Sequence, residues 1–184
     1  MTLTLLRAAD RPATAWLNGG GTTREIAGHP ADAGLADFAW RASLADVARG
    51  GPFSRFPDVD RVLTVVDGEG MLLTVDGTEH HAAPHRPFAF PGDADTRCRL
   101  PHGPVVAFNV MTRRGRARAT VDLARTTRPV DVPADADVLL VCLTGTATVG
   151  DTRLDRYDAA LLPPTSRHPL AVDGTTAVVT LHTR

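Results

Sequence analysis

Three polar side chains in strand-like segments suggest a site for an anion. Arg41, Arg61 and Asn109 each stand among alternating apolar residues, so each must face either solvent or the interior of the fold. A guanidinium can bind a carboxylate through two parallel hydrogen bonds, and a buried asparagine needs partners for its amide. Arg61 could equally pair with a neighbouring acid, and Asn109 could bond a nearby loop. The set predicts a pocket for a small organic anion or carboxylate.

A run of glycines near the amino terminus is a second candidate. Because glycine lacks Cβ, successive N–H groups in such a run can converge on an anion or a carbonyl. A flexible turn is the alternative, and the run lacks the lysine and the spacing of a phosphate-binding loop. The binding residues predicted for this region are Trp16, Asn18, Gly19, Gly20, Gly21, Thr22 and Glu25.

The loop before Arg61 should stand at the mouth of the pocket. Ser54 and Phe56 lie between prolines there, and Phe56 could wall a pocket or simply pack the loop. Asp60 adjoins Arg61 and is a further candidate for binding. Glu25 and Asp60 are also the carboxylates that could act as a general base, provided that burial lets them hold a proton near neutral pH. Catalysis by one of them is therefore the alternative to binding alone.

The histidines do not form a recognisable metal site. His80, His81 and His85 are the densest group, but adjacent residues of a strand point to opposite faces, so the first two would diverge. His168 stands alone, and one imidazole does not hold a metal ion. We expect neither a metal nor another cofactor.

The composition excludes several classes of partner. The formal net charge is -1, the pI is about 6.6, and every basic residue is arginine, so no basic field attracts nucleic acid or an acidic membrane. Two cysteines, Cys98 and Cys142, make no disulfide framework. The amino terminus lacks the features of a signal peptide, and no apolar run approaches a membrane span. We therefore expect a cytoplasmic protein.

Short apolar runs between prolines and glycines predict an all-β protein. The glycines of residues 67–70 predict a hairpin that joins the two strands flanking this segment, and Asp76-Gly77 predicts a second turn. Helices have little room, and the segment most favoured for a helical turn is Leu44–Arg49. The predicted strands are Phe38–Leu44, Arg61–Val66, Met71–Val75, Val105–Met111, Val138–Leu143, Ala159–Leu162 and Ala177–His182.

A weak internal repeat divides the chain. Residues 62–68 resemble residues 139–145, and each copy leads to an apolar segment that ends on proline, at Pro91 and Pro163. The shared order predicts two copies of one β-unit. Thr112–Pro133 is predicted to be an arm or linker between them.

The order of strands and glycine turns resembles the double-stranded β-helix of cupins. The resemblance implies two tandem barrels, a bicupin, with an amino-terminal barrel over residues 1–115 and a second cupin-like half over 116–184, in an arrangement that allows the halves to share strands. In metal cupins, histidines and a glutamate precede the first hairpin; residues 54–61 contain no histidine here, and Thr96 stands where a later histidine would fall. Without imidazoles the metal chelate is not assembled.

Six motifs in order resemble the HutD/Ves family over about the first 115 residues. They comprise residues 16–26, 40–45, 51–57, 60–61, Phe90 with Gly92-Asp93, and residues 108–115. The resemblance implies a metal-independent bicupin that binds a small molecule, acting as a sensor or accessory regulator linked to histidine utilisation or the stress response. The alternative is a metal-independent isomerase or hydrolase acting on a small carboxylate. Exposed strand edges make a homodimer plausible.

Overall fold

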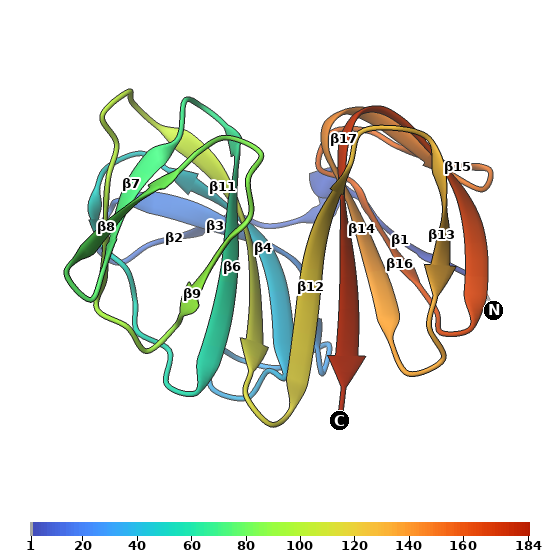
Figure 1. The fold of residues 1–184 in the computed structure, drawn as a ribbon, viewed down its shortest axis with the longest axis horizontal. Helices are drawn as coiled ribbons and strands as arrows, with labels where there is room; N and C mark the ends of the chain where they lie inside the picture. The colour runs from blue at the N-terminus through green and yellow to red at the C-terminus, as the bar shows by residue number, and fades with distance from the viewer. Residues whose placement is uncertain (1) are drawn as a thin grey trace. The chain divides into compact units, whose positions relative to one another are not determined.

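The computed structural model describes residues 2–184 and confirms an all-β protein. The chain divides into two compact units (Figure 1). The central unit comprises Pro12–Arg116, and the terminal unit comprises residues 2–11 together with Ala117–Arg184. Among the described residues, the one helical segment is the short 3-10 turn η1, Ala8–Asp10, and no helix is long or apolar enough to cross a bilayer.

The central unit contains two antiparallel sheets. One has six strands in the order β2-β3-β4-β11-β6-β9, and the other has four in the order β5-β10-β7-β8. Strands β4, β6 and β11 carry buried residues at almost every position, because both of their faces are covered. The strands are β2 (Thr14–Ala15), β3 (Gly21–His29), β4 (Trp40–Val47), β5 (Gly51–Pro52), β6 (Val59–Asp67), β7 (Met71–Val75), β8 (Thr78–Ala82), β9 (Phe88–Pro91), β10 (Thr96–Arg99) and β11 (Val105–Arg113).

The terminal unit is one sheet of seven strands. Its main path is β1-β16-β14-β17-β12, with β13 added to β17 and β15 to β14. The long strands β14 and β17 pair along almost their whole length. The strands are β1 (Thr4–Leu6), β12 (Ala117–Ala124), β13 (Arg128–Val132), β14 (Asp137–Val149), β15 (Thr152–Leu154), β16 (Ala159–Leu162) and β17 (Ser166–Thr183).

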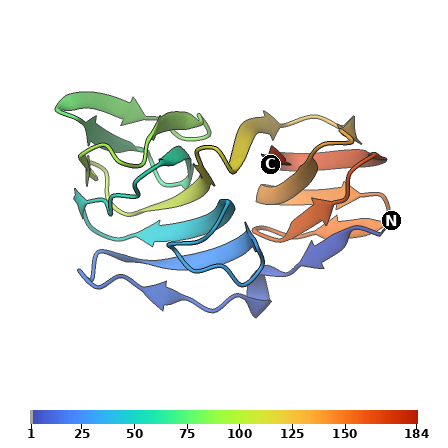
Figure 2. The ribbon, with the colours of Figure 1, turned by 90° about the horizontal axis from the view of Figure 1, so that it is seen from below.

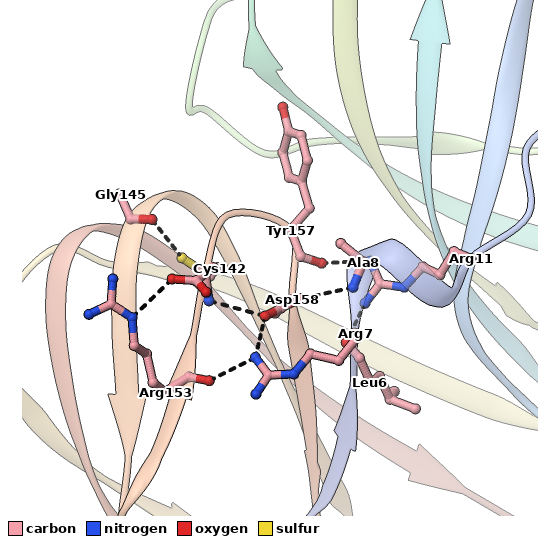
Figure 3. Close-up of polar contacts among 10 residues, drawn as sticks. Leu6, Arg7, Ala8, Arg11, Cys142, Gly145, Arg153, Tyr157 and Asp158 are labelled. Carbon is pink, nitrogen blue, oxygen red and sulfur yellow. Dashed lines mark hydrogen bonds and ion pairs between the residues drawn. The ribbon is translucent and has the colours of Figure 1, made fainter.

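The predicted amino-terminal barrel began at residue 1, but residues 2–11 belong to the terminal unit instead. Strand β1 pairs with β16, so that the amino-terminal strand lies against the carboxy-terminal strands (Figure 2). A buried carboxylate fixes this segment: Asp158 accepts hydrogen bonds from the Ala8 amide at 2.7 Å and from Arg7 Nη1 at 2.6 Å (Figure 3). Arg11 Nη1 donates to the Tyr157 carbonyl at 2.6 Å. The apolar repeat could not show this pairing, because β1 has no counterpart in it.

The two units use the same pairing path, which accounts for the sequence repeat. In the central unit the path is β4-β11-β6-β9, and in the terminal unit it is β12-β17-β14-β16. The second sheet follows suit, with β5-β10-β7-β8 matched by β13-β17-β14-β15. Strand β14 therefore does the work of both β6 and β7, and its pairing with β17 is interrupted by a bulge between Cys142 and Thr144.

Three local predictions are wrong. Strands β6 and β7 do not form a hairpin: Gly68 and Gly70 have positive φ, but the turn carries the chain from one sheet to the other. The true hairpin is β7 with β8, across Asp76-Gly77. Leu44–Arg49 is not helical, since β4 continues to Val47, and the predicted linker contains the whole of β12 and of β13.

Candidate functional site

The register of the six-stranded sheet brings the predicted arginines and asparagine onto one face. Met111 on β11 stands opposite Arg41 on β4 and Arg61 on β6. Arg61 in turn stands opposite Phe90 on β9. Directly opposed residues of an antiparallel pair share a face, so the four side chains form one row across the sheet.

The neighbouring row of opposed residues also contains polar side chains. Asn109 stands opposite Ser43 on β4 and Leu63 on β6, and Ser43 stands opposite Glu25 on β3. Because side chains alternate along a strand, this row shares its face with the row of Arg61. Two neighbouring rows therefore gather Glu25, Arg41, Arg61 and Asn109, and we call these four residues the polar patch.

Arg61 is enclosed by aromatic rings. Its guanidinium carbon lies 5.0 Å from the ring centre of Phe53, 5.8 Å from that of Phe56 and 5.1 Å from that of Phe90. The residue is 8% exposed. Cation–π attraction offsets part of the cost of burying the charge.

Arg61 has no acidic partner among residues 2–184. Its Nη2 donates a long hydrogen bond of 3.4 Å to Asn109 Oδ1, and its buried Nε has no hydrogen-bond partner. Burial, and secondly the nearby charge of Arg41, lower the pKa of Arg61 from its ordinary value to about 10. The side chain is therefore still a cation at neutral pH, and it lies where solvent cannot stabilise its charge.

Arg41 is paired, in contrast to Arg61. Its Nε donates to Glu25 Oε2 at 2.6 Å; the Arg41 side chain is 16% exposed and that of Glu25 is 41% exposed. A β-bulge between Glu25 and Ala27 shifts the register of β3 against β4. Bulges re-aim the side chains beside them, and this one accompanies the contact of Glu25 with Arg41.

The rest of this face is apolar. A buried cluster fills the interior of the central unit beyond the polar patch, and its members include Ala45, Leu63, Val65, Leu73 and Ala107. Surface grooves of about 300 Å³ and 330 Å³ lie elsewhere, one along Asp46 and Pro104 and the other along Pro129 and Pro169. The sequence suggested an open polar cavity; the structure instead has a polar patch covered by phenylalanine rings.

The glycine run forms a closed turn. The Gly19 amide donates to the Trp16 carbonyl at 3.0 Å, and the Gly20 amide donates to Asn18 Oδ1 at 2.9 Å. Gly21 lies in β3, where a Cβ would come within 2.2 Å of the Asp46 carbonyl oxygen. These N–H groups are engaged within the turn, so the glycines serve close strand packing and do not form an open anion nest.

The other predicted residues lie apart from the polar patch or at its edge. Thr22 donates to Asp46 Oδ2 at 3.0 Å, and the Trp16 indole donates to Thr23 at 2.8 Å while its ring packs on the apolar cluster. Asp60 faces away from Arg61 and binds Arg114 Nε at 2.8 Å. Of the two residues predicted in that loop, Ser54 is exposed and Phe56 contacts Arg61.

No group of three or more potential metal ligands occurs in the part of the chain that the structure describes. His80 packs against Phe88 with tilted rings whose centres are 4.9 Å apart. His81 is on the opposite face of the hairpin, since successive residues of β8 alternate.

Two aromatic residues around Arg61 were missing from the predicted site. Phe53 adjoins the predicted Ser54, and Phe90 ends the apolar segment of the repeat. Phe90 and Arg61 lie far apart in the sequence, so that only the register of β9 against β6 shows them to be neighbours. A signal existed for Phe53, which lies in the same short motif as Phe56.

The all-β fold of this chain is similar to that of cupin-like proteins. Structures of low identity share the fold, among them a bacterial pirin in complex with nickel(II) from Escherichia coli, with a TM-score of 0.72 and 10% identity over 99% of both chains. The chain belongs to the HutD family, whose model matches residues 8–180.

Relatives of higher identity agree with this assignment. A structure of HutD from Pseudomonas fluorescens SBW25 (formate condition) is 34% identical with a TM-score of 0.90, and all of both chains is covered. Protein Ves of Citrobacter koseri is 44% identical over 61% of this chain and 59% of its own length. A 21.2 kDa protein encoded in the hutC 3' region of Pseudomonas putida is 42% identical over 64% of this chain and 62% of its own. The match thus spans about three fifths of these two relatives.

Proposed function

We propose that the central unit binds a small organic carboxylate at Arg61, without a metal ion. The observation that carries the proposal is the buried guanidinium, which has three aromatic neighbours and no acidic partner among the described residues. Asn109 and Arg41 flank it on the same face. A carboxylate is the natural counter-ion, because it matches the planar fork of arginine with two hydrogen bonds.

The energetic argument is that the protein compensates only weakly for the burial of the Arg61 charge. Transfer of a charge out of water is costly unless it is paired and hydrogen-bonded. Three rings and one long hydrogen bond at 3.4 Å are weak compensation for a guanidinium that is 8% exposed. A bound carboxylate would satisfy Nε and relieve the repulsion from Arg41.

Entry to the site would be through the segment between β5 and β6. This segment carries Phe53 and Phe56, while its intervening residues Ser54 and Arg55 are exposed. Displacement of these two rings would expose Arg61 without disturbing the sheet. The phenylalanines would then form the walls of the ligand site, as in most small-molecule pockets.

The wider role that we propose is a sensor or accessory regulator. Each unit would be a cupin-type double-stranded β-helix, giving two tandem barrels in which only the central one binds a ligand. The proposal is supported by the name of the Pseudomonas putida relative, which places that protein's gene beside hutC, and by the absence of a metal-ligand cluster among residues 2–184. The ligand would then be a carboxylate that reports on histidine use, and the working form a homodimer or a monomer in the cytoplasm.

Isothermal titration tests the binding proposal. We expect saturable heat with at least one of urocanate, formylglutamate and formate, and its loss in Arg61→Met. Arg99→Met is the matched control, because Arg99 is an exposed arginine of the same unit that is paired with Glu79. Absence of heat from all three compounds with the native protein would remove the proposal, and so would equal binding by Arg61→Met.

The alternative is an isomerase or hydrolase that uses a carboxylate as its base. Asp60 is held by Arg114 on the other face of the sheet, which leaves Glu25 as the carboxylate of the polar patch. Glu25 is bound to Arg41, an arrangement that suits a charged positioning group better than a proton acceptor. Turnover of any of the three compounds, lost in Glu25→Gln while binding persists, would favour the enzyme.

A further inference from the structure

Asn109 is the one side chain among residues 2–184 that forms a hydrogen bond with Arg61. It lies on β11, the strand paired with β6, one row away from Arg61 on the same face. Its Oδ1 accepts from Arg61 Nη2 at 3.4 Å, and its Nδ2 donates to the Ala107 carbonyl of its own strand, also at 3.4 Å. Asn109 is only 6% exposed. A neutral amide therefore occupies a buried position from which a carboxylate would pair with Arg61.

Glu25 and Asp60, the carboxylates of the predicted site, are engaged elsewhere. Glu25 lies on β3, with β4 and β11 between it and β6, and its carboxylate is bound to Arg41. Asp60 precedes Arg61 on β6 but faces the other side of the sheet, where it binds Arg114. The charge of Arg41 has the same sign as that of Arg61 and repels it. Residue 109 is therefore the position that decides whether the protein itself neutralises Arg61.

The amide at this position is not explained by packing. Asparagine and aspartate have nearly the same size and shape, and they differ in charge and in hydrogen-bonding groups. A carboxylate here would form charge-assisted hydrogen bonds with the guanidinium, whereas the amide oxygen accepts a single weak one. Because an unpaired buried charge is costly, an aspartate would compensate Arg61 better without a change of shape. The neutral residue is what the binding of an external anion requires.

We infer that Asn109 makes the site specific for an anionic ligand, because its neutral amide leaves the charge of Arg61 for an incoming carboxylate. The inference rests on the proposed binding at Arg61 and goes beyond it by assigning a specificity-determining residue. Asn109 acts through Arg61, whose Nε has no partner among the described residues and remains for the ligand. With an internal carboxylate at position 109, an anion would have to displace that group or lie beside a second negative charge.

Two substitutions of Asn109 separate charge from shape. Asn109→Asp keeps the shape and adds a charge, whereas Asn109→Leu keeps the approximate size and adds none. In titrations with urocanate, formylglutamate and formate, we expect Asn109→Asp to weaken binding by roughly a hundredfold, the order for one charge a few ångströms away in a buried site. Asn109→Leu should weaken it by about fivefold, the effect of one lost hydrogen bond. A structural role predicts the reverse order, since aspartate resembles asparagine more closely than leucine does.

Asn18→Asp is the matched control, because Asn18 is the other asparagine of the chain and lies exposed in the closed glycine turn. It should bind as the native protein does. If the native protein binds a ligand and Asn109→Asp binds it no more weakly than Asn109→Leu does, the role of Asn109 is overturned while binding at Arg61 stands. If the native protein binds none of the three compounds, binding itself fails and the inference fails with it.

Thermal unfolding of the ligand-free variants distinguishes a loss of charge from a loss of fold. Asn109→Asp should melt at least as high as Asn109→Leu, because Arg61 compensates the new carboxylate. In an Arg61→Met background the same aspartate should lower the melting temperature by roughly 10 °C, since it is then buried without a partner. An Asn109→Asp protein that does not fold, or that loses as much stability with Arg61 as without it, would show that the two side chains do not pair and would overturn the inference.

Discussion

The central and terminal units share a pairing path but differ in what fills it. In the central unit, Arg61 stands opposite Phe90; in the terminal unit, the corresponding pair is Val138 with Leu162. Asn109, which stands opposite Leu63, corresponds to Val178, which stands opposite Leu140. Two polar residues of the central unit, Arg61 and Asn109, thus correspond to two apolar residues of the terminal unit, Val138 and Val178. The same arrangement of strands therefore forms without the polar patch.

The terminal unit shows the same arrangement of strands with an apolar core in place of the polar patch. Its core is a continuous apolar cluster that includes Val138, Leu140, Leu154, Leu162 and Val178. The charged residue that it buries, Asp158, is hydrogen-bonded to Arg7, Ala8 and Asp155. The unpartnered Nε of Arg61 is the opposite case, and groups that fold stability does not explain are where ligand binding is to be sought.

The largest expected effect comes from moving the arginine into the wrong unit. Val138→Arg places an unpaired charge in a wholly apolar cluster, and we expect the free energy of unfolding to fall by about 4 kcal/mol. Urea denaturation measures this loss. Val138→Met, which adds length without charge, should cost about 1 kcal/mol. Equal losses in the two variants would show that charge is not what separates the units.

Removing the buried carboxylate of the terminal unit should have a smaller effect. Asp158→Asn weakens the contacts to Arg7 and Ala8, and we expect a loss of about 2 kcal/mol in thermal or urea unfolding, less than for a fully buried pair because the Arg7 side chain is 42% exposed. Asp151→Asn, in the exposed turn between β14 and β15, is the control and should unfold like the native protein.

The same residue predicts a dependence on pH. Burial tends to raise the pKa of Asp158, but hydrogen bonds from the Ala8 amide, Arg7 and the Asp155 amide outweigh it, so the pKa lies below its ordinary value of 3.8. A carboxyl group with a lowered pKa in the folded state stabilises the fold fully above its unfolded pKa, and this contribution is lost as pH falls through the folded pKa. The difference between the native protein and Asp158→Asn should therefore shrink as the pH is lowered below 3.8. A difference that stayed constant down to the lowest pH would contradict the role of the charge.

The smallest expected effect comes from replacing Arg61 in the central unit with an apolar residue. Arg61→Met makes the central unit resemble the terminal one, and we expect the ligand-free protein to gain about 1 kcal/mol, because an apolar side chain replaces an uncompensated buried charge. Thermal unfolding in a buffer without carboxylates measures the gain. Arg99→Met, which removes an exposed guanidinium, should leave stability nearly unchanged. A marked loss in Arg61→Met would assign the arginine to the fold instead.

Local sequence predicted strands better than it predicted their partners. Strands β7 and β16 have the predicted bounds, because runs of branched apolar residues end there at glycine, aspartate or proline. The turn at Gly68 and Gly70 was misassigned as a hairpin, since positive φ allows a reversal but does not choose the sheet that the next strand joins. Strand β12 alternates apolar and polar residues, the pattern of a half-exposed strand, but the arginines around it led to its assignment as part of a linker.

The sequence by itself determined the all-β class, the repeat, the family and the alternation that sets Arg41 and Ser43 on one face of their strand. Only the tertiary structure decided that Arg61 is ringed by phenylalanines, that Glu25 holds Arg41, and that the glycine run closes on itself. The reason is that strand propensity and side-chain alternation are local, whereas strand register joins residues far apart in the chain. Whether a charge is paired depends on that register, and so does what the charge can bind.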